Sequence, residues 1–282
     1  MLAKDASKRR RALWEKFLMA RFGRVGAALS GVLALLIVGC ASEEPVDALS
    51  KAGDDPAARA VAVLSAPWRY ADDHADDDLR KPANVLAFID IKPGMKLFEM
   101  EGGAGYYTEL FSPLVGPEGE VVMHNPESFD TFVADIVQKR IPGRLENVRI
   151  TKSNFDDLQV GNGAMDMVTW ILGPHDLYYT PGGIELGDDA AAFSEIMRIL
   201  KPGGVFIVLD HAARAGSPRS TGGTIHRIDP GLVLELATQA GFTLAGESDV
   251  LRNPDDNHDS NVFDPEVRRM TDRFLYKFKK PE

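Results

Sequence analysis

The sequence has one cysteine, Cys40, among its 282 residues. A single cysteine excludes an intramolecular disulfide and any zinc site built from several cysteines. Positive charge is also scarce, because 32 Lys and Arg stand against 42 Asp and Glu, a formal net charge of -10. The chain contains 44% hydrophobic and 26% charged residues, a composition that excludes disorder as the main state and suits one large α/β core or two small ones.

The charge is unevenly distributed along the chain. Residues 1–39 hold eight basic and two acidic side chains, so residues 40–282 hold 24 basic and 40 acidic side chains, a net charge of -16. Affinity for nucleic acid depends mainly on Lys and Arg side chains that neutralise phosphates. We therefore expect this acidic body to bind neither DNA nor structured RNA.

The basic N-terminal stretch leads into an apolar run, Val25–Gly39. A membrane-spanning helix needs about 20 residues, so this run of about fifteen is typical of a signal-peptide core. The run ends in Leu36-Ile37-Val38-Gly39-Cys40, which resembles the bacterial lipobox, where an aliphatic and a small residue precede a cysteine that is lipidated. The alternative is a buried structural cysteine. We predict that residues 1–39 are a signal peptide, with Met19 as an alternative start.

The lipobox resemblance implies a lipid anchor on Cys40 and a periplasmic location. Ala41 and Ser42 follow the cysteine, and the absence of an Asp directly after it implies transfer to the outer membrane. Residues 40–66 are predicted to be the lipidated N-terminus and a tether, with a helix over Ala57–Leu64 as an alternative there, and residues 67–282 the folded domain. A cytoplasmic protein, in which the leader has no export role, is the alternative.

An acidic run follows the predicted tether. Five carboxylates surround His74 within Asp72–Asp78. Oxygen ligands suit Ca²⁺ and Mg²⁺, but the spacing matches no EF-hand loop. We favour a helix start, where acidic side chains complement the N-terminal dipole, and we predict no metal site in this chain.

Residues 95–110 carry the pattern that organises the rest of the sequence. An apolar strand contains Glu99 near its end, passes through a glycine-rich turn and enters an amphipathic helix. Gly103 and Gly105 lack a Cβ, so they allow a tight turn and a close approach of a ligand to the backbone. The helix N-terminus presents free N–H groups to the same place. The pattern predicts a ligand-binding loop at the carboxyl end of a strand.

This segment resembles the first motif of class I S-adenosylmethionine-dependent methyltransferases, in which an acid precedes a row of three glycines. Glu99, Gly103 and Gly105 match that motif. The resemblance implies that these residues and Tyr107 hold S-adenosylmethionine. Glu101 stands where the first glycine of the motif belongs.

The resemblance covers residues 81–281 and implies the fold. It is an α/β fold with three αβα layers and a Rossmann-like, mostly parallel sheet that ends in an antiparallel C-terminal hairpin. Within the family the sequence is most similar to a bacterial group of predicted methyltransferases with secretory or lipoprotein leaders. The expected strands are 95–100, 119–123, 147–150, 164–172, 205–210, 242–244 and 274–278.

Further cofactor contacts are implied at three positions. Asn125 follows the second expected strand, where family members usually place an acid that bonds the ribose. Asn154 lies in the segment that resembles the adenine-contact turn, where an Asp is common. Phe155 is expected to pack on the adenine face, and a core aromatic is the alternative.

Candidate catalytic residues follow the fourth expected strand. His175 and Asp176 resemble the pair of small-molecule methyltransferases, in which the histidine is a general base for a hydroxyl or an acidic carbon. The unperturbed pKa of histidine suits that role, and a structural histidine is the alternative. Tyr178 is a candidate substrate contact, as are Asp210 and His211 at the carboxyl end of the fifth strand, where open α/β sheets bind ligands.

The predicted function is S-adenosylmethionine-dependent methyl transfer to a small molecule by a protein anchored in the cell envelope. The alternative is a non-catalytic lipoprotein of methyltransferase fold that binds another ligand or a partner. Glu101, Asn125 and Asn154 favour the alternative, because they depart from the usual cofactor contacts. The cytoplasmic location of S-adenosylmethionine favours it too.

Overall fold

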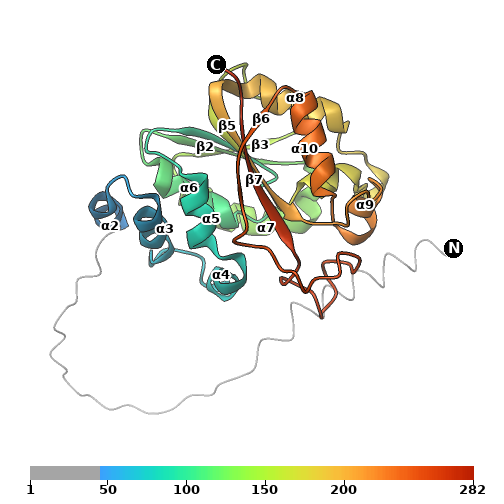
Figure 1. Cartoon of the computed structure of the whole chain (residues 1–282). Coiled ribbons are helices and arrows are strands. Elements are labelled where there is room, and N and C mark those ends of the chain that lie inside the picture. Colours follow the sequence, from blue (N-terminus) through green and yellow to red (C-terminus); the bar gives the residue numbers. More distant parts are fainter. Residues whose placement is uncertain (1–44) are drawn as a thin grey trace, which may run out of the picture. The chain divides into compact units, whose positions relative to one another are not determined.

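The computed structural model describes residues 45–282, which build a seven-stranded sheet with helices on both faces (Figure 1). The strand order is β3-β2-β1-β4-β5-β7-β6. The expected signal peptide, the start at Met19 and the lipid anchor on Cys40 lie outside the described residues. The strands are β1 (Lys96–Met100), β2 (Glu120–Asn125), β3 (Val148–Lys152), β4 (Met165–Ile171), β5 (Leu200–His211), β6 (Thr243–Ser248) and β7 (Arg273–Lys279).

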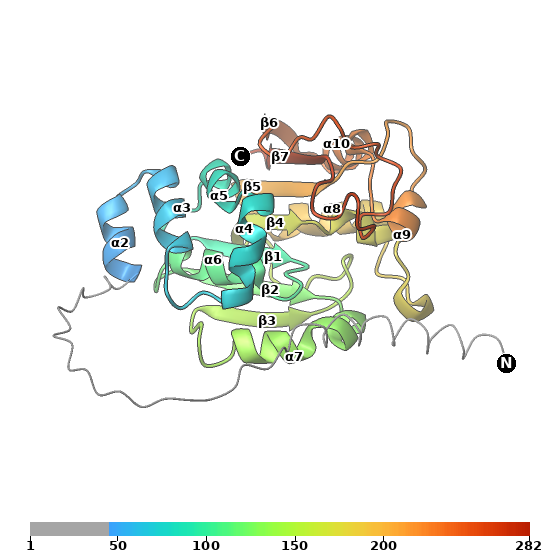
Figure 2. The same cartoon turned by 90° about the horizontal axis from the view of Figure 1, so that it is seen from below.

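The pairing of the strands confirms the predicted fold. β1 pairs in parallel with β2 and β4, β2 with β3, and β4 with β5, whereas β7 is antiparallel to both β5 and β6. In Figure 2 the sheet runs from β3, beside α7, to the β6–β7 pair, beside α10. The strand order reverses between β1 and β4, and in open α/β sheets this switch point opens a crevice at the carboxyl ends of the strands.

Helices fill the connections between the strands. Among residues 45–282 no helix combines the length and the apolar character that crossing a membrane requires. The α-helices are α2 (Pro45–Ala52), α3 (Pro56–Leu64), α4 (His74–Arg80), α5 (Pro82–Ile89), α6 (Tyr106–Val115), α7 (Asp130–Arg140), α8 (Asp189–Ile199), α9 (Thr221–Ile225) and α10 (Pro230–Gln239). Short 3-10 helices are η1 (Ala71–Asp73), η2 (Glu127–Phe129), η3 (Pro174–Tyr178) and η4 (Pro181–Gly183).

Alternation along β5 shows how the sheet buries both faces. Ile207 and Leu209 belong to the core that includes residues of α3, α5 and α6. Phe206 and Val208 belong to the core on the other face, with residues of α8 and α10. Successive side chains of a strand point to opposite faces, so a strand covered on both sides is a nearly continuous apolar run. Asp210 continues this run and is fully buried, which marks it as a polar group with a specific partner.

The predicted tether is wrong where the structure describes it. α2 and α3 are helical, and Ala60 and Val63 of α3 are buried in the core with residues of α5 and α6. The buried Arg59 donates from Nη2 to the carbonyl of Leu114 at 2.7 Å. The apolar spacing of α3 thus serves packing, and the folded domain begins before residue 67.

Ion pairs account for the acidic run at 72–78. The run forms η1 and α4, and Asp77 receives two hydrogen bonds from Arg69, at 2.7 and 2.9 Å. Asp73 pairs with Arg140 of α7 at 2.9 Å. Asp73 and Asp77 thus join η1 and α4 to neighbouring segments, whereas Asp72 and Asp78 are exposed, so the favoured interpretation as a helix start holds.

Candidate active site

Three segments meet at the carboxyl edge of the central strands. They are the glycine loop between β1 and α6, the 3-10 helix η3 after β4, and the end of β5 at Asp210 and His211. β1 and β4 are neighbours, as are β4 and β5, so the ends of these strands place the three segments side by side. A fourth segment of the site, α9, follows β5 in the sequence.

The glycine loop has the backbone that its residues predict, with one exception. Gly103 and Gly105 have φ values of 58° and 88°. Glu101 also has a positive φ, 56°, which is the left-handed region that favours glycine. The position therefore has the conformation of the missing first glycine, and a glutamate occupies it. Its Oε2 accepts a hydrogen bond from Trp170 Nε1 of β4 at 2.9 Å.

Asn125 holds the loop by both of its amide atoms. Its Oδ1 accepts from the backbone N–H of Gly103 and its Nδ2 donates to the carbonyl of the same residue, each at 2.9 Å. A carboxylate has no N–H to donate, so an acid at this position would lose one of these bonds. Asn125 is thus placed beside the loop as predicted, and its amide supports the backbone of Gly103.

Two buried titratable groups lie under the loop. Burial raises the pKa of Glu99 to about 7, and the hydrogen bond from Thr108 Oγ1, at 2.5 Å, opposes that rise. Burial lowers the pKa of His124 to about 4, so its ring is neutral near pH 7. His124 Nε2 donates to the carbonyl of Ser153 at 2.9 Å, which ties the end of β2 to the turn after β3. Glu99 supports the loop from within the core.

The other implied cofactor contacts lie in different surroundings. Tyr107 is buried in the core with α5 and stacks on Phe111 with ring centroids 5.6 Å apart. Phe155 is fully buried and packs on Trp170, with centroids 5.0 Å apart, as the alternative of a core aromatic expects. Asn154 is exposed. The structure therefore does not bring the side chains of Tyr107 and Phe155 together on an open face beside the glycine loop.

His175 is held by Asp210. Its Nδ1 lies 2.8 Å from Asp210 Oδ1, and its backbone N–H donates to Asp210 Oδ2, also at 2.8 Å. Burial lowers the pKa of His175, but the carboxylates of Asp210 and Asp176 outweigh burial and raise the value to about 9. Because Nδ1 is used by Asp210, Nε2 is the ring nitrogen left to face the site.

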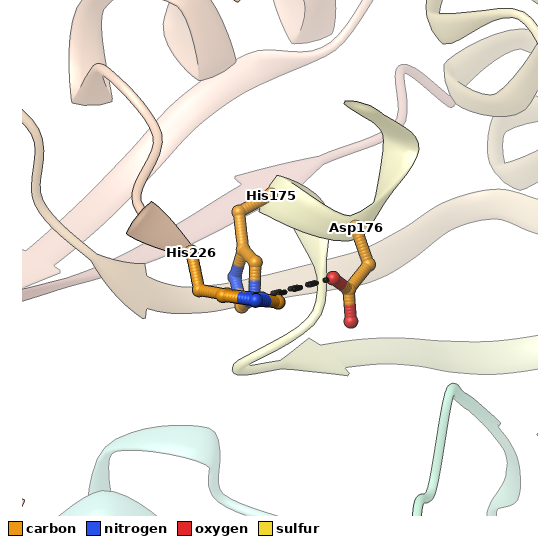
Figure 3. A group of neighbouring side chains, drawn as sticks. All are labelled: His175, Asp176 and His226. Atoms are coloured by element: carbon orange, nitrogen blue, oxygen red, sulfur yellow. Dashed lines mark ion pairs between the residues drawn. The ribbon is translucent and has the colours of Figure 1, made fainter. Parts of the chain in front are cut away.

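The carboxylate of Asp176 faces two neighbouring imidazole rings, those of His175 and His226 (Figure 3). Its Oδ1 is 3.4 Å from His175 Nε2 and 3.5 Å from His226 Nδ1. Burial raises the pKa of Asp176, but His175 and other neighbours outweigh it and lower the value. Burial and the nearby charge of Asp176 raise the pKa of Glu101 well above its usual range, so Glu101 is the neutral carboxyl of this cluster.

The remaining predicted contacts have partners of their own. Tyr178 donates its hydroxyl to Asp189 Oδ2 of α8 at 2.6 Å. His211 Nδ1 lies 2.6 Å from Thr271 Oγ1, and burial with the neighbouring charge of His175 lowers the pKa of His211 well below its usual range. The rings of His175 and His211 are 6.0 Å apart, so His211 borders the cluster.

Sequence reasoning missed His226. It ends α9 with a φ of 56°, and its ring packs against Tyr179 and Phe263, with centroids 5.2 and 4.9 Å apart. His226 belongs to none of the motifs from which the site is predicted. The sequence around it offers a histidine followed by an arginine, but no local pattern places that histidine beside His175.

The sheet order, the glycine loop after β1 and the polar cluster after β4 and β5 define a class I S-adenosylmethionine-dependent methyltransferase. The ubiE/COQ5 methyltransferase family matches residues 78–218, half of the chain. The chain therefore belongs to the ubiE/COQ5 methyltransferase family. Membership confirms the predicted enzyme class.

Curated relatives are similar over part of the chain. A "Ubiquinone/menaquinone biosynthesis C-methyltransferase UbiE" of Shewanella sp. (strain W3-18-1) is 32% identical over 119 residues, which is 42% of this chain and 43% of the relative. The protein of the same name from Shewanella oneidensis matches to the same extent. The match thus spans less than half the length of these relatives.

Solved structures share the fold. A chain in the complex between the Haloferax volcanii Trm112 methyltransferase activator and a methyltransferase has a TM-score of 0.54 and 16% identity, and the match covers 79% of this chain and 98% of that one. The [4+2]-cyclase SpnF has a TM-score of 0.52 and 17% identity, with 83% and 94% covered. A SAM-dependent methyltransferase from Aquifex aeolicus has a TM-score of 0.50 and 17% identity, with 72% and 97% covered. At these identities the likeness shows the fold alone.

S-adenosylmethionine is the cofactor that the family and fold imply, and the residues of the loop fit it. A Cβ at Gly103 would meet no atom within 4 Å, so the backbone there is open to a ligand. Gly105 and the first turn of α6 are buried, and Glu99 accepts hydrogen bonds from the backbone and the hydroxyl of Thr108, so the open part of the loop is at Gly103. Glu101 turns to Trp170 and leaves the open side at Gly103 clear.

Proposed function

We propose that this protein transfers a methyl group from S-adenosylmethionine to a small molecule that binds beside His175. The observation that carries the proposal is the His175–Asp210 pair, which lies next to the glycine loop in a chain of the ubiE/COQ5 methyltransferase family. When bound, S-adenosylmethionine supplies an electrophilic methyl group. The residues of the chain have to hold the acceptor, orient it and handle its proton.

The geometry around His175 suits it to remove a proton from the methyl acceptor. Asp210 accepts from both the backbone N–H and Nδ1, which fixes the ring and its tautomer. With a pKa of about 9 the His175 ring carries a proton on Nε2 near pH 7, so it has to lose that proton before Nε2 can accept one from an acceptor hydroxyl or acidic carbon, and methyl transfer should become faster as the pH rises toward 9. Asp176 stands on the same side of the ring and limits the acceptor to groups that tolerate a carboxylate neighbour.

A turnover assay tests this function. The full chain in detergent is supplied with S-adenosylmethionine and a panel of phenols, hydroxy acids and 1,3-dicarbonyl compounds, and the demethylated cofactor product is quantified. We expect at least one acceptor to be methylated by the wild type and kcat to fall about 100-fold in His175→Gln, the usual size of a proton-transfer contribution. Binding of the cofactor without product from any acceptor would favour the non-catalytic alternative.

We also propose that the protein is a lipoprotein of the cell envelope. The proposal is supported by the Leu36–Cys40 motif after an apolar run of signal-peptide length, and by Ala41 and Ser42, which favour the outer membrane. Lipid chains contribute about 0.8 kcal/mol per buried methylene, so several chains give a stable anchor. Radiolabelled palmitate should enter the wild type and not Cys40→Ser. Equal labelling, or a wild type found only in the cytoplasm, would contradict it.

A further inference from the structure

We propose that His175, Asp176 and His226 bind one divalent transition-metal ion, which takes an oxygen of the methyl acceptor as a further ligand. The second half of this statement rests on the proposed function, because it places the acceptor in the same cluster, and it assigns the loss of the acceptor's proton to the metal, since a coordinated His175 Nε2 cannot also be the base. The first half stands on the side chains alone. Figure 3 shows the two rings and the carboxylate directed toward one another from η3 and from the end of α9.

The separations suit one ion. One ligand atom from each of the three side chains lies within 4.8 Å of the others. Asp176 Oδ1 is 3.4 Å from His175 Nε2 and 3.5 Å from His226 Nδ1. Ligands bound at about 2.1 Å in a tetrahedral arrangement stand about 3.4 Å apart. The three atoms can therefore contact a common centre with small adjustments of their side chains.

An unsatisfied oxygen points into this centre. Asp176 is 9% exposed, and its Oδ1 is buried and accepts no hydrogen bond although two ring nitrogens are near. The two ring nitrogens pair with this oxygen by charge at 3.4 and 3.5 Å, but these distances are long for the hydrogen bonds that would replace its lost water, so the oxygen remains under-satisfied. A cation between Oδ1 and the two nitrogens would satisfy the oxygen. It would take the place of a proton on His175 Nε2 and release that proton to solvent.

His175 has the outer-shell support of a metal ligand. Histidines that bind metals usually donate their other ring N–H to a carboxylate or carbonyl, which fixes the ring. Asp210, fully buried, provides this contact at Nδ1 and also binds the backbone N–H. The free Nε2 is on the side of Asp176.

His226 is held in position by its own neighbours. A Cβ at Gly222 would lie 2.2 Å from the carbonyl oxygen of His175, so glycine is what lets α9 pack directly on η3. Arg227, the next residue after His226, is fully buried and pairs with Asp256 at 2.7 and 3.0 Å. The second imidazole is thus brought to the first by packing and a buried ion pair.

The ligand set indicates the class of metal. Imidazole nitrogens suit Zn²⁺ and Fe²⁺ better than Mg²⁺ or Ca²⁺, which prefer oxygen. Two histidines and one carboxylate leave coordination positions open, as in catalytic zinc and non-haem iron sites. An acceptor hydroxyl at an open position would ionise more readily and give its proton to solvent. The acceptor class is therefore an oxygen compound, such as a phenol or an enolisable carbonyl.

Metal binding is tested on the full chain, prepared without a polyhistidine tag and dialysed against a chelator. Titration with Zn²⁺ and Co²⁺ is followed by calorimetry, by Tm and by the visible absorption of Co²⁺. We expect one equivalent to bind to the wild type, and Mg²⁺ at the same concentration not to bind. Asp176→Asn and His226→Gln should each weaken binding by at least about 100-fold, since second-shell losses alone reach 10–100-fold. His258→Gln, which removes another His–Asp pair, should bind as the wild type does.

The outcomes separate this proposal from the proposed function. Wild-type protein that binds no Zn²⁺ or Co²⁺ stoichiometrically, or folded Asp176→Asn and His226→Gln that bind as tightly as the wild type, would overturn the metal site. Methyl transfer that persists at full rate in chelator would overturn the role of the metal in holding the acceptor. The affinity for S-adenosylmethionine is measured separately, and in each variant it should stay within about twofold of the wild-type value. A wild type that binds no S-adenosylmethionine would count against the proposed function and not against the metal site.

Discussion

Asp210 and His175 are joined by two hydrogen bonds that cross from β5 to η3. The carboxylate accepts from the backbone N–H of His175 and meets its Nδ1, each at 2.8 Å, and a third bond comes from the N–H of His211 at 2.7 Å. The side chain of Asp210 is completely buried. This one carboxylate therefore fixes the segment after β4, the tautomer of His175 and the end of its own strand.

Asp210→Asn should destabilise the fold. The amide would place an N–H group against an N–H donor, so at least one buried group would lose its partner, at a cost of about 2 kcal/mol. Urea unfolding measures the change. Asp130→Asn is the control, since Asp130 makes a surface pair with Lys152 and such pairs contribute less than about 1 kcal/mol. Equal stabilities of the two variants would contradict this account of Asp210.

The unfolding free energy of the protein should depend on pH through the ionisation of Glu99. Its pKa is raised from 4.5 to about 7, so the folded state binds the proton more tightly than the unfolded chain does. The stabilisation is complete below pH 4.5 and is lost as the pH rises through about 7. Glu99→Gln has no carboxyl group to titrate at this position. The difference in unfolding free energy, wild type minus Glu99→Gln, should therefore fall by on the order of 3 kcal/mol between pH 4.5 and about 7. Urea titrations at several pH values measure it, and a constant difference would exclude this origin.

An acid at position 125 should be less favourable in this chain than the asparagine. Asn125→Asp retains the acceptor for the N–H of Gly103 but places a carboxylate against its carbonyl oxygen. We expect a loss of about 1–3 kcal/mol in unfolding free energy and weaker binding of S-adenosylmethionine. Asn154→Asp, at an exposed position, is the matched control and should leave stability nearly unchanged. An Asn125→Asp variant that is more stable than the wild type would show that the two hydrogen bonds between the Asn125 amide and Gly103 do not stabilise the loop.

Helix α3 should behave as part of the core. Val63 is fully buried, whereas Val61, on the same helix, is 57% exposed. Val63→Asp buries a charge without a partner and should cost about 3 kcal/mol or more, while Val61→Asp should stay within about 0.5 kcal/mol. Thermal unfolding of the two variants compares them directly. A tether would make both substitutions neutral, and that result would restore the original expectation for residues 40–66.

Local patterns were enough to predict most of the fold. Apolar runs bounded by glycine and proline located the strands, and the resemblance supplied their order, which the pairing of β5 with β7 confirms. Boundaries moved by a few residues, because strand ends depend on pairing with neighbours. α3 was missed as a core element because its short apolar stripe sits among Ala, Asp and Pro residues that are equally typical of linkers.

The site was harder to predict, because its members come from distant segments. The position of His175 and of Asp210 follows from the ends of the fourth and fifth strands. The approach of His226 depends on Gly222 packing against η3 and on the Arg227–Asp256 pair, contacts that link residues far apart in the sequence. Phe155 illustrates the same limit, since only the packing of Trp170 decides between a ligand contact and the core.

Binding of S-adenosylmethionine to the glycine loop is the most direct test of the central claim. Calorimetric titration of the full chain should give one site. Gly103→Ala, which adds a methyl group to the open face of the loop, should weaken it about tenfold, or about 1.4 kcal/mol. Gly143→Ala is the matched control, with the same left-handed backbone and open surroundings but a place before β3, and should bind as the wild type does. No heat at millimolar ligand, or equal affinity in both variants, would contradict the account.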